Sequence, residues 1–304
     1  MTFGDWLDHC RTELEKSGLW FGHGTDNAHD EAAWLVLAAL GRPPDGRMPG
    51  GNLEVDPEQG KRIERLLQQR VQTRQPLAYL VGEAWFCDLR FLVTPDVLVP
   101  RSPIAELVRG EFRPWIRPKR VSRVLDLCTG CGAIGIAVAL HMPGVEVDAS
   151  DISFAALKIA AKNRAIHGAE DRVTLIESDL FGALDGRRYD LVISNPPYVS
   201  KAQFDVLPRE YRAEPEIGLV SSGHGLFIPF KILRDAPEHL SPEGILVCEV
   251  GENAASLQAL LPDVPLTWIE FEHGGEGVFT IGRDEMLAHR QAIEQALEGL
   301  QDVV

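Results

Sequence analysis

The sequence predicts an α/β fold: a mostly parallel sheet of seven strands, one of them antiparallel, preceded by a small helical domain. From Val121 onward, short patterns rich in β-branched residues alternate with helical patterns, the order typical of a parallel sheet covered by helices on both faces. Up to about residue 75, apolar residues instead recur at helical spacing. We therefore expect a helical domain at 1–75, a hairpin and linker at 76–120, and the sheet domain at 121–304.

Three helices are expected in the N-terminal domain. The first covers residues 5–14, whose apolar side chains share one helical face. The second covers 27–40 and ends before a Gly-Arg-Pro-Pro segment. The third has a clear start, because Asp56 is a capping residue, Pro57 suits the first helical turn and Gln59 can complete a capping box.

A β-hairpin is expected at 83–99, where the sequence alternates and is rich in aromatic and β-branched residues. In the sheet domain, the expected strands are 121–127, 145–150, 172–177, 189–194, 244–250, 265–272 and 277–282. The expected helices are 132–141, 153–167, 226–239 and 253–261, with one terminal helix after Gly282. Only residues 273–276 join the last two strands, which permits an antiparallel pair but no crossover helix. Ligands of such a sheet bind at the carboxyl ends of its strands.

Composition limits the classes of function. The chain is 45% hydrophobic and 25% charged, with a net charge of −15 and a pI near 5.0. A field of this sign repels nucleic acid and anionic lipid and attracts basic partners, although a local basic patch would defeat the argument. The five cysteines suggest no disulfide framework, the N-terminus is too acidic for a signal peptide, and the longest apolar run, 32–40, is too short to span a bilayer. We expect a soluble cytoplasmic protein that neither reads nucleic acid nor enters a membrane.

A glycine-rich turn follows the first strand of the sheet domain. The strand ends in Asp126 and Leu127, and the turn continues as CTGCGAIG from Cys128 to Gly135. Glycines at a strand-to-helix turn let a ligand approach the backbone and present N–H groups at the helix start. Taken alone, the pattern also occurs in tight turns that bind nothing.

Two more carboxylates stand at the ends of the next two strands. Asp151 closes the second strand, where it can accept hydrogen bonds from both hydroxyls of a ribose. Asp179 follows the third strand, where it can accept from an adenine amine. The alternative for each is a helix-capping Asp, which is common after strands. Counting Asp126, three acidic strand ends around one glycine loop favour a nucleoside site.

Two other ligands compete for this loop. Gly130 to Gly135 fits the dinucleotide pattern GxGxxG, but Thr129 and two cysteines crowd the loop and the sheet ends in an antiparallel hairpin. Cys128 and Cys131 form C-x-x-C, yet zinc normally needs four ligands and the sequence has no second pair at suitable spacing. We therefore expect a nucleoside-containing ligand and no metal.

The whole pattern, DLxTGxGxIG followed by an acid at the next strand end, resembles the class I S-adenosylmethionine-dependent methyltransferases. The resemblance implies their fold, S-adenosylmethionine as methyl donor and S-adenosylhomocysteine as product. The donor-binding residues that it implies are Asp126, Cys128, Thr129, Gly130, Gly132, Asp151, Asp179, Leu180 and Asn195.

The fourth strand of the sheet domain ends in Asn195-Pro196-Pro197-Tyr198. The prolines lack N–H groups, so the strand stops and the backbone is rigid. A planar NH2 group can donate one hydrogen to the Asn195 side-chain carbonyl and the other to the Pro196 backbone carbonyl, which leaves its lone pair facing a methyl donor. Tyr198 can stack on the flat substrate. We expect Asn195, Pro196 and Tyr198 to be catalytic, and these three with Pro197 to bind substrate.

The NPPY motif does not name the substrate, because glutamine, adenine and cytosine all present an NH2 group. With its helical N-terminal domain and hairpin, however, the chain resembles the protein-glutamine N-methyltransferases. Members modify the glutamine of a Gly-Gly-Gln motif in release factors, or a glutamine in a ribosomal protein. VPRSPI at 99–104, LPREYRAEPE at 207–216 and FEHGGEGVF at 271–279 resemble the ribosomal type, whereas the release-factor type has PRPETE at the first place. Leu180 stands where release-factor relatives often have an aromatic residue.

The resemblance implies methyl transfer to a glutamine side-chain nitrogen of the large-subunit ribosomal protein uL3, a basic partner that suits an acidic enzyme. The charge of the helical N-terminal domain, acidic at Asp26, Asp30 and Glu31, makes it a natural docking surface for such a substrate; a small packed helical bundle with a solvated polar face explains each of these residues equally well. Three alternatives stay open: the same reaction on release factors, methylation of adenine in DNA, and a non-catalytic assembly factor that binds the donor.

Overall fold

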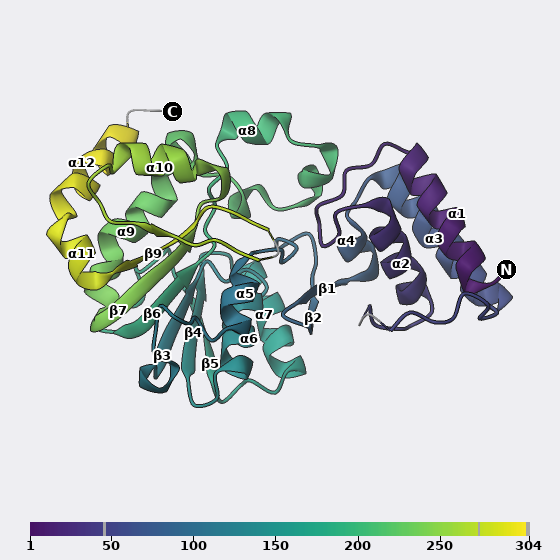
Figure 1. The fold of residues 1–304 in the computed structure, drawn as a ribbon, viewed down its shortest axis with the longest axis horizontal. Helices are drawn as coiled ribbons and strands as arrows, with labels where there is room; N and C mark the ends of the chain where they lie inside the picture. Colours follow the sequence, from purple (N-terminus) through teal and green to yellow (C-terminus); the bar gives the residue numbers. More distant parts are fainter. Residues whose placement is uncertain (45–46, 273, 302–304) are drawn as a thin grey trace. The chain divides into compact units, whose positions relative to one another are not determined.

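The computed structural model describes residues 1–44, 47–272 and 274–301, which fold into two units (Figure 1). The first unit consists of Met1–Pro95, Val99–Arg101 and Pro208–Glu214, and the second of the other described residues. The first unit is therefore built from three separate pieces of chain, and the last of these comes from far along the sequence.

Among its described residues, the first unit contains four α-helices and a β-hairpin. These elements are α1 Phe3–Lys16, α2 Ala28–Ala39, α3 Pro57–Thr73, α4 Leu77–Val81, β1 Glu83–Phe86 and β2 Leu89–Leu92. The predicted start of α3 is confirmed: Asp56 accepts from the N–H groups of Glu58 and Gln59 at 2.9 Å, and the Gln59 side chain accepts from the Asp56 N–H at 3.2 Å. This reciprocal cap satisfies N–H groups that the first helical turn leaves without partners. The predicted hairpin is also present, with Glu83 opposite Leu92, but its strands end at Leu92 and not at the predicted residue 99.

Two carboxylates of the segment Pro208–Glu214 are buried inside the first unit. Glu210 accepts from the Arg74 guanidinium at 2.7 Å, and Glu214 forms a bidentate pair with Arg101 in which both N–O distances are 2.6 Å. Burial raises the pKa of Glu214, but the Arg101 guanidinium outweighs this effect, so that the pKa lies at about 2. The segment is thus fixed in the first unit by charge-assisted hydrogen bonds.

A third carboxylate, Glu31 on α2, is also inside the first unit. It is 2% exposed and accepts from Arg70 Nε at 2.7 Å. The prediction that Glu31 contributes to an acidic docking surface is therefore wrong, because α2 is buried on most sides and α3 supplies the counter-charge. Asp26 and Asp30, the other two candidates, are exposed.

The second unit is built around a seven-stranded sheet in the order β5-β4-β3-β6-β7-β9-β8. Its strands are β3 Arg123–Leu127, β4 Glu146–Asp151, β5 Val173–Glu177, β6 Tyr189–Ser194, β7 Leu240–Glu249, β8 Thr267–Trp268 and β9 Val278–Gly282. Strands β3 to β7 pair in parallel, whereas β9 is antiparallel to both of its neighbours. The predicted sheet with one antiparallel strand is confirmed. His273, within the predicted connection between β8 and β9, lies outside the described residues.

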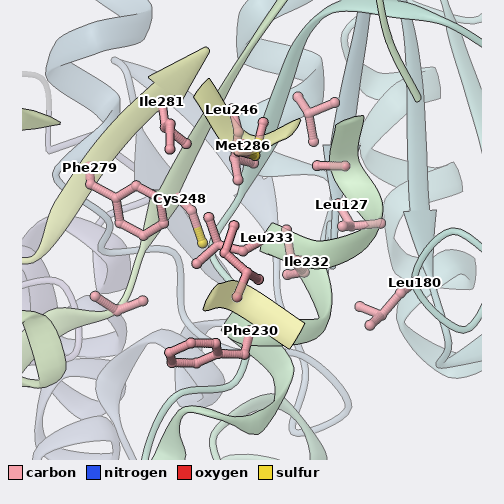
Figure 2. Close-up of a cluster of buried hydrophobic side chains, with 14 of the residues drawn as sticks. Leu127, Leu180, Phe230, Ile232, Leu233, Leu246, Cys248, Phe279, Ile281 and Met286 are labelled. Carbon is pink, nitrogen blue, oxygen red and sulfur yellow. The ribbon is translucent and has the colours of Figure 1, made fainter. Parts of the chain in front are cut away.

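Helices cover both faces of this sheet, with α6 and α7 on one face and α9, α11 and α12 on the other (Figure 1). The helices are α5 Ile104–Arg109, α6 Ala133–His141, α7 Phe154–Ile166, α8 Lys201–Val206, α9 Phe227–His239, α10 Ala254–Leu260, α11 Arg283–Ala288 and α12 Arg290–Gln301. In the apolar core of the second face, Phe230 and Leu233 of α9 lie near Leu246, Cys248 and Phe279 of the sheet (Figure 2). Among the described helices, none has the length and hydrophobicity needed to cross a lipid bilayer.

Two expectations about the C-terminal elements are wrong. β8 has only two residues, Thr267–Trp268, instead of the predicted 265–272; farther along the chain, the N–H of Glu272 donates to the Glu106 carboxylate at 3.1 Å. The single terminal helix is divided into α11 and α12 at His289, where the backbone leaves the helical conformation.

Candidate active site

The carboxyl ends of β3 and β6 lie side by side in the middle of the sheet. Leu127, the last residue of β3, pairs with Ser194, the last residue of β6, and the Ser194 hydroxyl donates to the Leu127 carbonyl at 2.8 Å. The chain order of the strands reverses between β3 and β6, and open α/β sheets bind ligands at such a switch point. Cys128 and Asn195, the next residue after each strand, therefore begin neighbouring loops at the expected ligand site.

Asp126 fixes the glycine loop to the strand that precedes it. Its carboxylate accepts from the Thr129 hydroxyl at 2.5 Å and from the Gly135 N–H at 2.8 Å, and its side chain is fully buried. Burial raises the pKa of Asp126 to about 6, against the lowering effect of the two hydrogen bonds. These bonds give Asp126 a role in shaping the loop, whereas its direct contact with a donor stays a prediction.

The glycines of the loop serve two different purposes. An added Cβ at Gly132 would lie 2.9 Å from Ile136 Cδ1, and φ is +84° there, so no other residue fits without strain. At Gly130, where φ is +57°, an added Cβ would meet no atom within 4 Å. Cys128 also has a positive φ, +63°, although it is not glycine. Such backbone strain is concentrated at functional sites, and here it leaves one side of Gly130 open to a ligand.

Asp151 connects the glycine loop to the end of β4. Its Oδ2 accepts from the Gly130 N–H at 2.8 Å, and its Oδ1 accepts from the Ser153 N–H at 2.8 Å. The N-cap of α7 is Ser153, whose hydroxyl accepts from the Ala156 N–H, so Asp151 holds the cap residue and is not itself the helix-capping Asp that was its alternative. Each carboxylate oxygen still has a lone pair for a further donor such as a ribose hydroxyl.

Asp179 and Leu180 point to opposite environments. Asp179 is exposed, and its side chain bonds to none of the described residues. No described helix follows β5 before β6, so the helix-capping alternative does not apply to Asp179. Leu180 is 7% exposed and belongs to the apolar core, at a φ of +47° (Figure 2). The strained backbone thus directs Leu180 inward and leaves the Asp179 carboxylate accessible.

Asn195 is the polar group that the fourth strand delivers to the site. The residue is half-buried, and within the described chain its side-chain amide has no hydrogen-bond partner. Polar groups of a folded protein normally find a partner once they are removed from water. An amide with both its donor and its acceptor unused, beside the glycine loop, is therefore available to a ligand.

Tyr198 is fixed by the strand next to β6. Its hydroxyl donates to Glu249 Oε1 at 2.9 Å, and the other oxygen of Glu249 accepts from the Ser102 hydroxyl at 2.5 Å. The Asn253 amide donates to the Tyr198 backbone carbonyl at 2.5 Å. Glu249, at the end of β7, is 5% exposed, so these are bonds of a buried carboxylate. Tyr198 is consequently held at both its hydroxyl and its backbone.

Two glycines pack directly against Tyr198. An added Cβ at Gly225 would lie 2.1 Å from the Tyr198 carbonyl oxygen, and one at Gly251 would lie 2.7 Å from Cε2 of the ring. Both glycines also have positive φ, +88° and +51°. No other residue fits at either position unless the tyrosine moves.

The residues that hold Tyr198 were not predicted from the sequence. Glu249 carried a usable signal, since it is a carboxylate at the end of a strand adjacent to β6. Ser102 and Asn253 carried none, because they come from loops far from the NPPY motif. The same holds for Asn163, which is fully buried on α7 and donates to the Cys131 carbonyl at 2.9 Å.

The C-x-x-C pair consists of a half-buried cysteine, Cys128, and a buried one, Cys131. Burial raises the pKa of Cys131 to about 12 and also raises the pKa of Cys128. Redox-active cysteines are thiolates whose pKa is lowered. The two thiols are therefore protonated at neutral pH, and their role as small residues that line the loop stays a prediction.

S-adenosylmethionine fits the residues of this site. The open side of Gly130 gives room for a ligand against the backbone. Asp151 and Asp179 offer carboxylate oxygens for ribose hydroxyls and an adenine amine, and a sulfonium cation is favoured by an acidic surrounding. The donor has no pyrophosphate, so the site needs no basic residue for it.

Comparison with known proteins gives two matches to family models and several close relatives. The methyltransferase small domain matches residues 115–210, and the PrmC N-terminal domain matches residues 5–82. The ribosomal protein uL3 glutamine methyltransferase of Xanthomonas campestris pv. campestris is 46% identical over 97% of this chain and 95% of its own length. The proteins of the same name from Xylella fastidiosa (strain Temecula1) and Francisella tularensis subsp. tularensis are 46% and 39% identical, over 96% and 97% of this chain and 93% and 94% of theirs.

Among solved structures, the hMettl16 catalytic domain is similar with a TM-score of 0.50 and 18% sequence identity. The match covers 80% of this chain and 89% of that one. At this identity the likeness concerns the fold alone, which is that of a methyltransferase.

Proposed function

The chain belongs to the family of ribosomal protein uL3 glutamine methyltransferases, and we propose on this basis that it transfers a methyl group from S-adenosylmethionine to a glutamine side-chain nitrogen of uL3. The observation that carries the chemistry is the half-buried Asn195 amide, which has no partner in the described chain and lies next to the glycine loop at the switch point of the sheet. Both groups needed for the transfer, a donor site and an amide-binding site, adjoin there.

When bound, S-adenosylmethionine supplies an electrophilic methyl group and leaves as S-adenosylhomocysteine. Asp151 and Asp179 would hold its nucleoside, and the open backbone at Gly130 would lie against it. Asp126 keeps the loop in the shape that this requires.

Asn195 and Pro196 orient the substrate amide. Its NH2 group donates one hydrogen to the Asn195 side-chain carbonyl and the other to the Pro196 backbone carbonyl. The nitrogen lone pair then faces the donor. An amide nitrogen is a weak nucleophile because its lone pair is delocalised, so catalysis is chiefly alignment, which supplies on the order of 7–11 kcal/mol in favourable cases. The methylated nitrogen sheds its proton after attack, so no strong base is needed beforehand.

Tyr198 forms a wall of the amide site. Its hydroxyl is bound to Glu249 and its backbone to Asn253, so the ring cannot turn without breaking a bond to a buried carboxylate. Gly225 and Gly251 pack directly against Tyr198 and so restrict where its backbone and ring can lie. A ring fixed in this way confines the flat substrate amide to one plane.

We further propose that the helical region 1–75 docks the substrate and that the protein acts in the cytoplasm. The exposed Asp26 and Asp30 suit a basic ribosomal protein, because opposite charges favour encounter. The net charge of −15 acts in the same direction.

The test is methylation of purified uL3 with labelled donor, with the unchanged protein and with Asn195→Ala. The variant should retain donor binding within about twofold and lose about 100-fold or more in turnover, because only alignment is removed. Turnover that survives the substitution would contradict the role of Asn195. A second arm offers purified release factor: methylation of that protein and not of uL3 would transfer the activity to the other branch of the family.

A further inference from the structure

A cavity lined by arginines lies entirely within the first unit. It has a volume of about 740 Å³ between α2, α3 and the hairpin. Arg42, Arg62, Arg65 and Arg90 line it, and Glu83 is the carboxylate among its lining residues. A cavity of this size is in the range of small-ligand sites.

Three of these arginines have no ion-pair partner in the described part of the chain: Arg42, Arg62 and Arg65. Arg90 pairs with Glu83 at 3.1 Å, which accounts for that carboxylate. The lack of partners is unexpected in a chain with 45 acidic and 30 basic residues, where a surface arginine has many acidic neighbours to choose from. Arg62 and Arg65 are three residues apart on α3 and so share one helical face.

An aromatic ring completes the cavity. Trp85 of β1 lines it and is half-buried, and its indole Nε1 is buried without a hydrogen-bond acceptor among the described residues. The ring of Trp85, and not its buried Nε1, is therefore the part of this side chain that a ligand in the cavity can contact. Guanidinium forks bind phosphate oxygens in pairs, and indole rings stack on nucleobases.

We propose that this cavity binds the phosphodiester backbone of single-stranded RNA, with Trp85 against a base. The choice of RNA rests on the proposed function, because a protein of the large ribosomal subunit is accompanied by RNA during assembly. The net charge of −15 does not prevent such binding, since charges farther away than about 8–10 Å are screened at physiological salt and the local arginines decide. The contacts proposed are to phosphate and to a base face, so they carry no reading of sequence.

The test is fluorescence anisotropy of the full chain with a labelled ten-nucleotide RNA that cannot pair with itself. The unchanged protein should bind with an affinity that falls steeply with salt. Arg62→Ala with Arg65→Ala should weaken binding about tenfold or more at low salt and make the logarithmic salt slope shallower by about 1.4, the value for two lost phosphate contacts on a single strand.

A matched control removes two positive charges from the same unit outside the cavity. Arg11 and Lys16 of α1 are exposed or half-exposed and paired with Glu15 and Glu13 at 2.9 Å. Arg11→Ala with Lys16→Ala should change RNA affinity less than twofold. An equal loss in both double variants would overturn the proposal, because binding would then follow total charge and not the cavity.

Two competitors separate the possible sources of the anion. One competitor is a ten-residue polyglutamate, and the other is uridine monophosphate at the nucleotide concentration of the RNA. The assignment to RNA would be overturned if either displaced the labelled RNA as well as unlabelled RNA does. These measurements need neither donor nor uL3, so their outcome is independent of the methylation assay.

Discussion

Replacing Asp126 by asparagine should change how the stability of the second unit depends on pH. The pKa of the buried Asp126 carboxyl lies at about 6, above its ordinary value of 3.8. Between about pH 4 and pH 6 the Asp126 carboxyl is therefore protonated in the folded state but ionised in the unfolded chain. The contribution of this group to the free energy of unfolding consequently rises as pH falls through 6. Holding the carboxylate ionised at pH 7 costs the folded state about 3 kcal/mol. About 2 kcal/mol of this is recovered between pH 7.0 and pH 4.5.

Asparagine carries no charge at either pH, so it removes this cost. Its NH2 group, however, takes the place of Oδ1, which has no partner among the described residues, and an unsatisfied buried donor costs about 1–3 kcal/mol at any pH. We expect Asp126→Asn to be more stable than the unchanged protein by about 0–2 kcal/mol at pH 7.0. Between pH 7.0 and pH 4.5 the unchanged protein gains about 2 kcal/mol of stability and the variant gains none from this position. At pH 4.5 the variant should therefore be less stable than the unchanged protein by about 0–2 kcal/mol.

The assay is hydrogen exchange in graded urea, read on peptides that cover 123–139 so that only the second unit is reported. Dilute protein is needed at pH 4.5, because the pI is near 5.0. Asp179→Asn is the matched control: this carboxylate is exposed and has no partner in the described chain, so stability should change by less than about 0.5 kcal/mol at both pH values. A stability difference for Asp126→Asn that is the same at both pH values would show that the carboxylate is not the buried, proton-binding group described above.

Three further outcomes are expected. Tyr198→Phe should reduce kcat/KM on uL3 about tenfold with donor affinity unchanged, because it removes a hydrogen bond to a buried carboxylate worth about 1.5 kcal/mol; an unchanged kcat/KM would contradict the role of that bond. Glu214→Gln should destabilise the first unit by about 3 kcal/mol at pH 7, since the pKa of Glu214 is about 2. This loss, followed by exchange of first-unit peptides, should shrink as pH falls from about 4.5 toward 2, where the parent carboxyl takes up its proton. Gly225→Ala should abolish turnover, because its Cβ would lie 2.1 Å from the Tyr198 carbonyl oxygen, whereas Gly18→Ala, with φ +58° and no atom within 4 Å, should leave turnover intact; equal activities would refute the packing argument.

The features predicted correctly from the sequence are those whose causes lie within a few residues. The α3 cap depends on Asp56, Pro57 and Gln59, and the sheet depends on alternation that repeats within each strand and helix. The approach of Asn195 to the glycine loop also followed from local pattern, because strand order and strand ends determine which loops meet.

The features that were missed depend on partners far along the chain. Glu214 pairs with Arg101 across 113 positions, and Glu249 pairs with Ser102 across 147. The burial of Glu31 could not be foreseen either, because an acidic residue at a helix start is usually exposed and only the position of Arg70 explains its place. For this reason the sequence indicated which residues are candidates for the substrate-amide site but not which residues fix their positions.

The placement of Pro208–Glu214 within the first unit has a consequence for dissection of the protein. A fragment that stops at residue 95 keeps Arg74 but loses Glu210, and the complementary fragment keeps that carboxylate without its guanidinium. Each product of a single cut thus carries an orphaned charge in place of an ion pair, and breaking a buried pair costs about 3–5 kcal/mol. Gene fusion or domain exchange with this protein has to carry both pieces together.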